Sequence, residues 1–238
     1  MDYSQVSQLY IIQKNLKTIN TAIAIAAAKC HRSLESITLV AVSKGQPIKK
    51  IKAAIDCGQI HFGENYLQEA LPKIKALAKH NLIWHYLGKL QRRKAKLIAQ
   101  NFAWIETVAS YATAELLNNH CPAHLPYLNI CIQVNISKEP NKNGVCSEEA
   151  LDLAKKVRQL PNLRLRGLMA IPHYYNKLEL QLKSFNEIFS LAKTLHQHNI
   201  TIDTLSMGMS SDFPAAIIAG ATIVRIGTGI FGSRTKNI

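Results

Sequence analysis

The sequence contains only five cysteines, and they form neither a metal-binding pattern nor an even set for disulfides. Cys30, Cys57, Cys121, Cys131 and Cys146 include no C-x-x-C pair. An odd number without paired spacing argues against a disulfide framework and against a zinc site. We therefore expect free thiols, a reducing cytoplasm as the compartment, and no metal site.

Long hydrophobic runs are also missing. The longest apolar run near the N-terminus, residues 22–28, is far shorter than the roughly 20 residues that cross a bilayer as a helix. The first residues lack the basic and apolar regions of a signal peptide, and no Gly/Ser-rich linker divides the chain. The sequence predicts one soluble, cytoplasmic domain over residues 1–238.

Acidic residues are scarce, because 15 Asp and Glu face 29 Lys and Arg and give a formal net charge of +14 at pH 7. Such a charge suits nucleic acid, an anionic membrane surface or a small phosphorylated ligand. The chain has no basic stretch interleaved with aromatic residues, and no zinc-finger or basic-zipper spacing. We therefore expect a solvated basic surface, with neither nucleic acid nor a membrane as the main partner.

What the sequence does have is a regular alternation of short β-branched runs with segments of helical period. A long helix is predicted first, over residues 3–30, and helices follow most of the later strands, for example at residues 66–79, 92–100 and 178–198. The predicted strands are residues 37–42, 60–62, 82–86, 103–107, 128–134, 165–169, 204–207 and 222–226.

Eight strands alternating with helices in a chain of 238 residues predict an α/β fold, a (β/α)8 TIM-type barrel. A doubly wound open sheet is the alternative, although such sheets rarely need eight strands at this regular spacing. Because no full helix follows the last strand, we expect the extra N-terminal helix to take its place in the outer ring.

The functional residues of such barrels lie at the carboxyl ends of the strands, and phosphate groups commonly bind the loops after the seventh and eighth strands. Both loops here combine glycine with hydroxyl side chains, and the second adds an arginine that is costly on an apolar strand unless an anion meets it. Ordinary helix capping explains the first loop equally well. The candidate residues of the two loops are Ser206, Gly208, Ser210, Arg225, Gly227 and Thr228.

Lys44 directly follows a buried strand, where its amine is expected to be partly desolvated. Desolvation favours the neutral amine, which is the form that attacks an aldehyde. A lysine that simply reaches water from the strand end is the alternative interpretation. A strand-end lysine opposite a phosphate-binding cup nevertheless suits pyridoxal 5′-phosphate, whose aldehyde would meet the amine and whose phosphate would meet the loops.

Six segments at the predicted strand ends carry a family resemblance. In order they read VAVSK at 40–44, FGENY at 62–66, WHYLGKLQ at 84–91, GLMAIP at 167–172, LSMGMS at 205–210 and VRIGT at 224–228. Together they resemble, over about residues 37–234, the pyridoxal phosphate homeostasis protein family, whose barrel is that of the alanine racemase N-terminal domain.

The resemblance implies that Lys44 holds pyridoxal 5′-phosphate as an internal aldimine, a covalent Schiff base, and that Asn65 lies near the ring hydroxyl. It also implies that the six loop residues line the phosphate end, and that His85 and Met169 are walls of the site. The family commonly has threonine where this chain has Gly45, and we expect the glycine to loosen the loop after the lysine.

A second departure from the family lies after the third strand, where the family usually has an asparagine before the lysine and this chain has arginines. Cations at a helix N-terminus are mildly unfavourable, so something should offset them. A solvated basic face and a rim that steers the dianionic cofactor inward are both open. The five basic residues of this segment are Lys89, Arg92, Arg93, Lys94 and Lys96.

Three functions are compared. The resemblance implies that in alanine racemase a separate C-terminal domain supplies a second acid/base, and this chain ends within a dozen residues of its last strand. We therefore expect a non-catalytic protein that buffers pyridoxal 5′-phosphate and supplies it to apo-enzymes, acting as a monomer. A minimal amino-acid racemase is the alternative from the enzyme class, and a nucleic-acid binder is the alternative suggested by charge.

Overall fold

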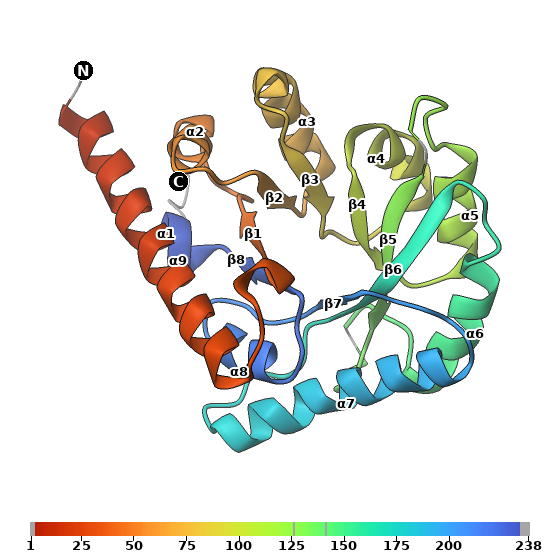
Figure 1. Ribbon diagram of the computed structural model, residues 1–238. Coiled ribbons are helices and arrows are strands. Elements are labelled where there is room, and N and C mark those ends of the chain that lie inside the picture. The colour runs from red at the N-terminus through yellow and green to blue at the C-terminus, as the bar shows by residue number, and fades with distance from the viewer. Residues whose placement is uncertain (1–2, 126, 141, 234–238) are drawn as a thin grey trace.

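The computed structural model describes residues 3–125, 127–140 and 142–233, and its strands form a closed parallel barrel (Figure 1). Neighbouring strands follow the order of the sequence, and β8 pairs with β1 to close the barrel. This confirms the predicted TIM-type barrel and excludes the open sheet. The strands are β1 Thr38–Val42, β2 His61–Glu64, β3 Ile83–Tyr86, β4 Trp104–Val108, β5 Leu128–Val134, β6 Leu163–Ala170, β7 Thr204–Ser206 and β8 Ile223–Ile226.

Helices surround the barrel on its outside, as Figure 1 shows. Short 3₁₀ turns, at Leu34–Ser36, Ala78–His80 and Arg92–Lys94, lie between some of the elements. The α-helices are α1 Tyr3–Lys29, α2 Ile48–Asp56, α3 Leu67–Ala76, α4 Ala95–Asn101, α5 Tyr111–Asn119, α6 Ser147–Val157, α7 Leu178–Gln197, α8 Phe213–Ile218 and α9 Thr228–Phe231.

The N-terminal helix takes a place in this outer ring, as the sequence predicts. Helix α1 packs against α2, α8 and α9, which Figure 1 shows at the left of the barrel. Its buried residues recur every three or four positions, as in Ile12, Leu16, Ile19 and Ile23, so one face of the helix is apolar. The helix that follows β8, α9, has only four residues, which leaves room for α1 beside the last strand.

Two predicted helices differ from the structure at their ends. The helix expected over residues 66–79 ends at Ala76. A separate 3₁₀ turn, Ala78–His80, follows and is capped by Asn81, whose φ is 45°. The helix expected over residues 92–100 begins as the 3₁₀ turn Arg92–Lys94 before α4. Helix ends commonly tighten into 3₁₀ turns, which the apolar periodicity does not reveal.

The strands carry several charged or ionisable side chains that are buried. Glu64 lies on β2, His85 on β3, Glu106 on β4 and Arg225 on β8, and each is at most 4% exposed. Buried charges require partners, so these strands are built around a polar network as well as an apolar core.

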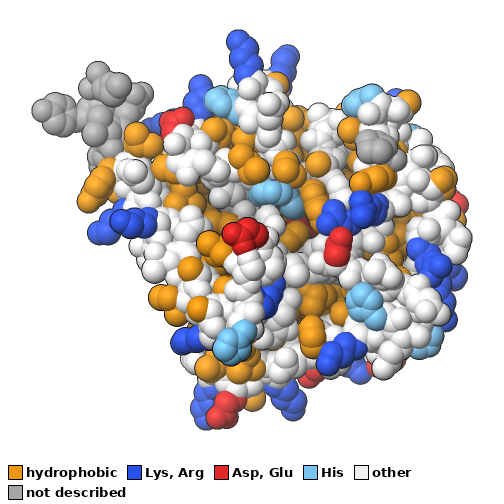
Figure 2. All heavy atoms as spheres, viewed as in Figure 1, with side chains coloured by type: hydrophobic (Ala, Val, Ile, Leu, Met, Phe, Trp, Pro, Cys, Tyr) orange, Lys and Arg blue, Asp and Glu red, His pale blue; other side chains and the backbone are white. Residues whose placement is uncertain are grey.

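Positive charge is spread over the surface. In Figure 2, Lys and Arg side chains are distributed around the visible face, and Asp and Glu side chains are fewer. The cysteines are free. Within the described part of the chain, no helix is both long enough and apolar enough to cross a bilayer.

Candidate functional site

A cavity of about 300 Å³ opens at the carboxyl ends of the strands. Six of the eight predicted site residues line it: Lys44, Asn65, Ser210, Arg225, Gly227 and Thr228. Apolar side chains, Met169 among them, complete its walls. Its full lining among the described residues is Val42, Lys44, Asn65, Leu87, Met169, Ile171, Met209, Ser210, Ser211, Arg225, Gly227 and Thr228.

Lys44 lies in a tight turn directly after β1. The amide of Gln46 donates to the carbonyl of Ser43 over 3.0 Å, and Gly45 between them has a φ of 70°. A positive φ at the third position of a turn is typical of type II turns and favours glycine. Gly45 thus gives Lys44 a defined turn, which differs from the expected loosening of this loop. Lys44, half-buried, lines the cavity from the β1 side.

Asn65 follows β2 and presents a buried acceptor to the cavity. Its Nδ2 donates to the carbonyl of Leu87 over 3.3 Å. Its Oδ1 is buried and accepts no hydrogen bond from the described residues. Buried acceptors are rarely left unpaired, so this oxygen is suited to accept a hydrogen bond from a ligand.

Arg225 forms a fixed cation on the β8 side of the cavity. One guanidinium nitrogen donates to Ser206 Oγ over 2.5 Å, and the other donates to the carbonyl of Ala170 over 3.0 Å. Ser206 in turn donates to Oε2 of Glu106 over 2.5 Å, and that oxygen lies 4.0 Å from Arg225. The arginine therefore keeps one orientation, since carboxylate, hydroxyl and carbonyl oxygens surround it.

Glu106 remains ionised inside the barrel. Burial alone would raise the pKa of this carboxyl group, but hydrogen bonds from His85 and Ser206 and the charge of Arg225 outweigh burial and lower it. Ser206 is fully buried between Glu106 and Arg225 and is not part of the cavity lining. Its contact is with the arginine, so the structure places it behind the predicted phosphate end.

Hydroxyl groups from the loops after β7 and β8 meet at the cavity. Thr228 Oγ1 lies 3.2 Å from Ser210 Oγ, and the amide of Gly229 donates to Ser210 Oγ over 3.3 Å. Gly208 lies outside the lining, and its φ of 93° lets the chain turn close to α8, where a Cβ would be 2.6 Å from Ala216 Cβ. The hydroxyls and nearby amides suit an anion such as a phosphate group.

The expectation that His85 is a wall of this site is wrong. His85 lies within β3 rather than after it, one layer below the strand ends. Its Nδ1 is 2.6 Å from Oε1 of Glu106, and its ring stacks on Trp104. It lines a separate hollow of about 310 Å³ where the strands begin, together with His61 and Arg166.

The basic segment after β3 does not line the cavity either. None of its residues is among the described lining residues. Arg92, Arg93 and Lys94 form a 3₁₀ turn, and Lys94 donates to Oε1 of Gln68 over 3.2 Å. Any influence of this segment on a ligand must therefore act from outside the cavity.

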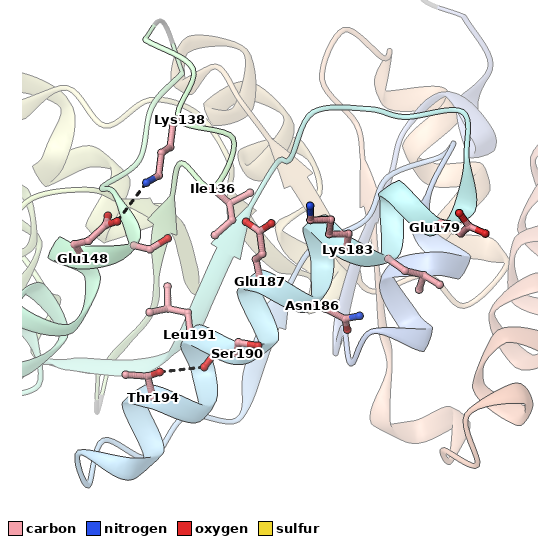
Figure 3. Close-up of a pocket in the computed structure, with 12 residues that line it drawn as sticks. Ile136, Lys138, Glu148, Glu179, Lys183, Asn186, Glu187, Ser190, Leu191 and Thr194 are labelled. Carbon is pink, nitrogen blue, oxygen red and sulfur yellow. Dashed lines mark hydrogen bonds and ion pairs between the residues drawn. The ribbon is translucent and has the colours of Figure 1, made fainter.

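A larger hollow of about 860 Å³ runs along α7 (Figure 3), and Lys44 is not among its described lining residues. Figure 3 shows Lys138 reaching Glu148 beside it, and these exposed side chains form an ion pair of 3.3 Å. Lys183 and Glu187 line it from α7. It contains none of the predicted site residues, and exposed ion pairs contribute little energy.

Sequence reasoning missed a buried cluster next to Lys44. Lys73 on α3 is only 5% exposed and lies between Glu64 and Glu69. The sequence offered one signal, a Glu and a Lys four positions apart on a predicted helix. That spacing is common on exposed helix faces, so it does not reveal that the lysine is buried.

The chain matches known proteins over almost its whole length. The family model described as alanine racemase, N-terminal domain, matches residues 15–235. The pyridoxal phosphate homeostasis protein of Escherichia coli (strain K12) is 47% identical over 230 residues, which cover 94% of this chain and 97% of that protein. The protein of the same name from Vibrio alginolyticus is 44% identical over 227 residues, with 94% and 97% coverage.

Solved structures show the same barrel. PipY of Synechococcus elongatus PCC7942 with PLP bound is 33% identical, with a TM-score of 0.81, and the match covers 93% of this chain and all of that one (100%). Alanine racemase of Clostridium difficile 630 is 16% identical, with a TM-score of 0.72, and the match covers 95% of this chain and 58% of that one. At that identity the likeness is one of fold alone.

Proposed function

The chain belongs to the pyridoxal phosphate homeostasis protein family, within the alanine racemase N-terminal domain fold, and from this premise we propose that it binds pyridoxal 5′-phosphate at the carboxyl ends of its strands. The observation that carries the proposal is that one cavity is lined both by Lys44 and by the hydroxyl groups of Ser210 and Thr228. An amine and an anion-binding group in a single small cavity match the two ends of this cofactor.

The residues present fit the cofactor. The orphaned Oδ1 of Asn65 can accept a hydrogen bond from the ring hydroxyl, and Leu87 and Met169 offer apolar contacts to the ring. Ser210 and Thr228 supply hydroxyl groups for the phosphate. Arg225, which is held in place by Ser206, supplies a fixed positive charge. Binding of the phosphate group would explain why a cation is buried there.

When bound, pyridoxal 5′-phosphate supplies an aldehyde that condenses with a primary amine and releases water. Lys44 is the residue in the cavity that would hold it covalently as a Schiff base. Because Lys44 lies in the turn after β1, its amine can enter the cavity while β1 stays paired with β8.

We further propose that the protein carries the cofactor rather than catalysing a reaction with it. Among the described residues that line the cavity, Lys44 is the one side chain that exchanges protons readily, since arginine stays protonated. Racemisation requires a second acid/base on the opposite face of the cofactor. One lysine suits uptake and release, so the protein would buffer the cofactor in the cytoplasm and supply it to apo-enzymes that need it.

The proposal is tested by the absorption spectrum of the purified protein before and after borohydride reduction. The expected result is a yellow protein whose band is lost on reduction, with the reduced cofactor attached to the peptide that contains Lys44. Lys44→Ala should lose the band and remain folded. Attachment to Lys49 or Lys138 instead would show that the assignment is wrong.

A second measurement separates a carrier from a minimal racemase. The loaded protein is incubated with several L-amino acids, and the D-enantiomers are quantified by chiral chromatography. We expect no turnover above that of free cofactor. Sustained turnover that Lys44→Ala abolishes would contradict the carrier role and leave cofactor binding intact.

A further inference from the structure

A buried group of charged side chains lies directly behind the turn that contains Lys44. Lys73 Nζ is 2.7 Å from Oε1 of Glu64 and also pairs with Glu69 one helical turn earlier. Glu64 is fully buried, and about a third of the Glu69 side chain is exposed. We call Glu64, Glu69 and Lys73 the lysine clamp.

The lysine clamp is poorly explained as a source of stability. Buried ion pairs often contribute no more than apolar side chains of the same volume, because both charges lose their hydration. Oε2 of Glu64 is buried and finds no hydrogen-bond partner among the described residues, which adds a cost. The cluster is better explained by the backbone that it contacts.

The lysine clamp holds the peptide group on each side of Lys44. Lys73 Nζ donates to the carbonyl of Ser43 over 2.8 Å, and the amide of Gly45 donates to Oε1 of Glu69 over 2.6 Å. The side chain of Ser43 also donates to Oε1 of Glu64 over 2.6 Å. The backbone before and after Lys44 is thereby tied to one rigid cluster.

These contacts hold the two peptide groups whose orientation sets the direction of the Lys44 side chain. The turn requires the positive φ of Gly45, and rotation of either flanking peptide would swing the Lys44 side chain away from the cavity. Reactions between two held groups depend steeply on their alignment, and a misplacement of about 1 Å costs up to 100-fold in rate.

We propose that Glu69 and Lys73 are positioning residues, which orient the amine of Lys44 toward the aldehyde of a ligand in the cavity. This inference rests on the proposed function, because it needs a Schiff base to form on Lys44. Glu64 completes the arrangement by holding Lys73 and Ser43 together. The lysine clamp thus sets the rate of covalent capture, while the hydroxyls of Ser210 and Thr228 serve binding of the phosphate.

Glu69 offers the cleanest test, because it is the most exposed member and its replacement leaves the buried pair of Lys73 and Glu64 in place. Apo-protein is mixed with pyridoxal 5′-phosphate in a stopped-flow instrument, and the rate constant of Schiff base formation is measured by absorbance. We expect Glu69→Ala to slow the reaction about tenfold. Glu69→Gln keeps an oxygen for the Gly45 amide and should stay within about twofold of the parent.

Two controls separate positioning from general damage. Glu115→Ala removes an exposed glutamate of α5 and should react like the parent. Pyridoxine 5′-phosphate has a hydroxymethyl group in place of the aldehyde, so its binding reports the cavity without the covalent step. Glu69→Ala should bind it with the affinity of the parent. Glu69→Asp, which keeps the charge and is too short to reach Gly45, serves as a second variant and should be slow.

The outcomes are distinct. Equal rates for the parent, Glu69→Ala and Glu69→Asp would overturn the positioning role and leave the proposed function standing. The role would also be overturned if Glu69→Ala lost as large a factor in pyridoxine 5′-phosphate affinity as in the rate of Schiff base formation, because the cavity itself would then have changed. A parent protein that forms no Schiff base would overturn both proposals.

Discussion

Nδ1 of His61 lies 3.0 Å from Nε2 of His85, inside the barrel near the starts of the strands. From His85 the contacts continue through Glu106 and Ser206 to Arg225, with distances of 2.5–2.6 Å. A single hydrogen-bonded chain therefore runs from one end of the barrel interior to the cavity at the other end. It passes through fully buried side chains, so its charge state affects the stability of the whole barrel.

The first prediction concerns the pH dependence of folding. Burial, and next the neighbouring His85, lower the pKa of His61 from 6.5 to about 4. Unfolded chains therefore bind a proton at His61 between pH 6.5 and about 4 that the folded protein does not bind. Stability should be fully present above pH 6.5 and fall through this window, by up to about 3 kcal/mol. Urea unfolding at several pH values measures it.

His61→Gln is the control for this prediction, because glutamine can still donate a hydrogen bond to His85 and does not titrate. The variant should show a shallower loss of stability than the parent between pH 6.5 and about 4. Identical pH profiles for the two proteins would show that His61 is not the group responsible.

The second prediction concerns the lysine clamp and stability. Lys73→Met leaves the buried carboxylate of Glu64 without its cation and should destabilise the protein by about 3–5 kcal/mol. Adding Glu64→Leu removes the unpaired charge and should restore much of the loss. Lys75→Met, on the exposed side of the same helix, should change stability by no more than about 0.5 kcal/mol. Denaturant titration compares them, and a harmless Lys73→Met would contradict the burial of this charge.

The third prediction concerns Arg225. Replacement with glutamine removes a charge-assisted contact and should weaken cofactor affinity by about 1.5–3 kcal/mol, with the Schiff base still formed at high cofactor concentration. Arg166→Gln is the matched control, because Arg166 pairs with Asp203 at the opposite end of the barrel. Titration of the apo-proteins measures both. Unchanged affinity in the Arg225 variant would show that this arginine does not meet the ligand.

The fourth prediction concerns the basic segment Lys89–Lys96. If its charges steer the dianionic cofactor, association should slow markedly from low to high salt. Arg92→Ala/Arg93→Ala should remove part of that dependence. Lys155→Ala/Lys156→Ala removes the same charge from α6 and should leave it unchanged. Stopped-flow association at several salt concentrations tests this, and equal salt slopes in the parent and the arginine variant would rule out steering.

The sequence was most informative at the strand ends. Two residues after the ends of β1 and β8 stand Lys44 and Thr228, and Ser210 lies in the loop after β7. The positions of the strands are therefore enough to bring these three residues to one face of the barrel. Alternation of strands and helices depends on local periodicity, which a single sequence displays. The same reasoning places α1 in the outer ring, because among the described residues β8 is followed by a helix of only four residues.

What the sequence did not reveal depends on contacts between distant segments. The motif WHYLGKLQ, which contains His85, predicts this histidine among the walls, but its position inside β3 places it one layer deeper. The burial of Lys73 follows from its contacts with Glu64 on β2 and with the carbonyl of Ser43 after β1, and no local pattern encodes these contacts. The sequence predicts that Ser206 lines the phosphate end, whereas its contacts with Glu106 and Arg225 depend on strands 100 and 19 positions away.

The position of α1 has a consequence for synthesis of the chain. Its apolar face packs on α8 and α9, and Asn15 donates to the carbonyl of Ile230. Ribosomes add about 5–20 residues per second, so α1 waits on the order of ten to forty seconds for helices that begin about 180 positions after it ends. The part of α1 that α8 and α9 cover therefore stays exposed long after α2, its other neighbour, has been made.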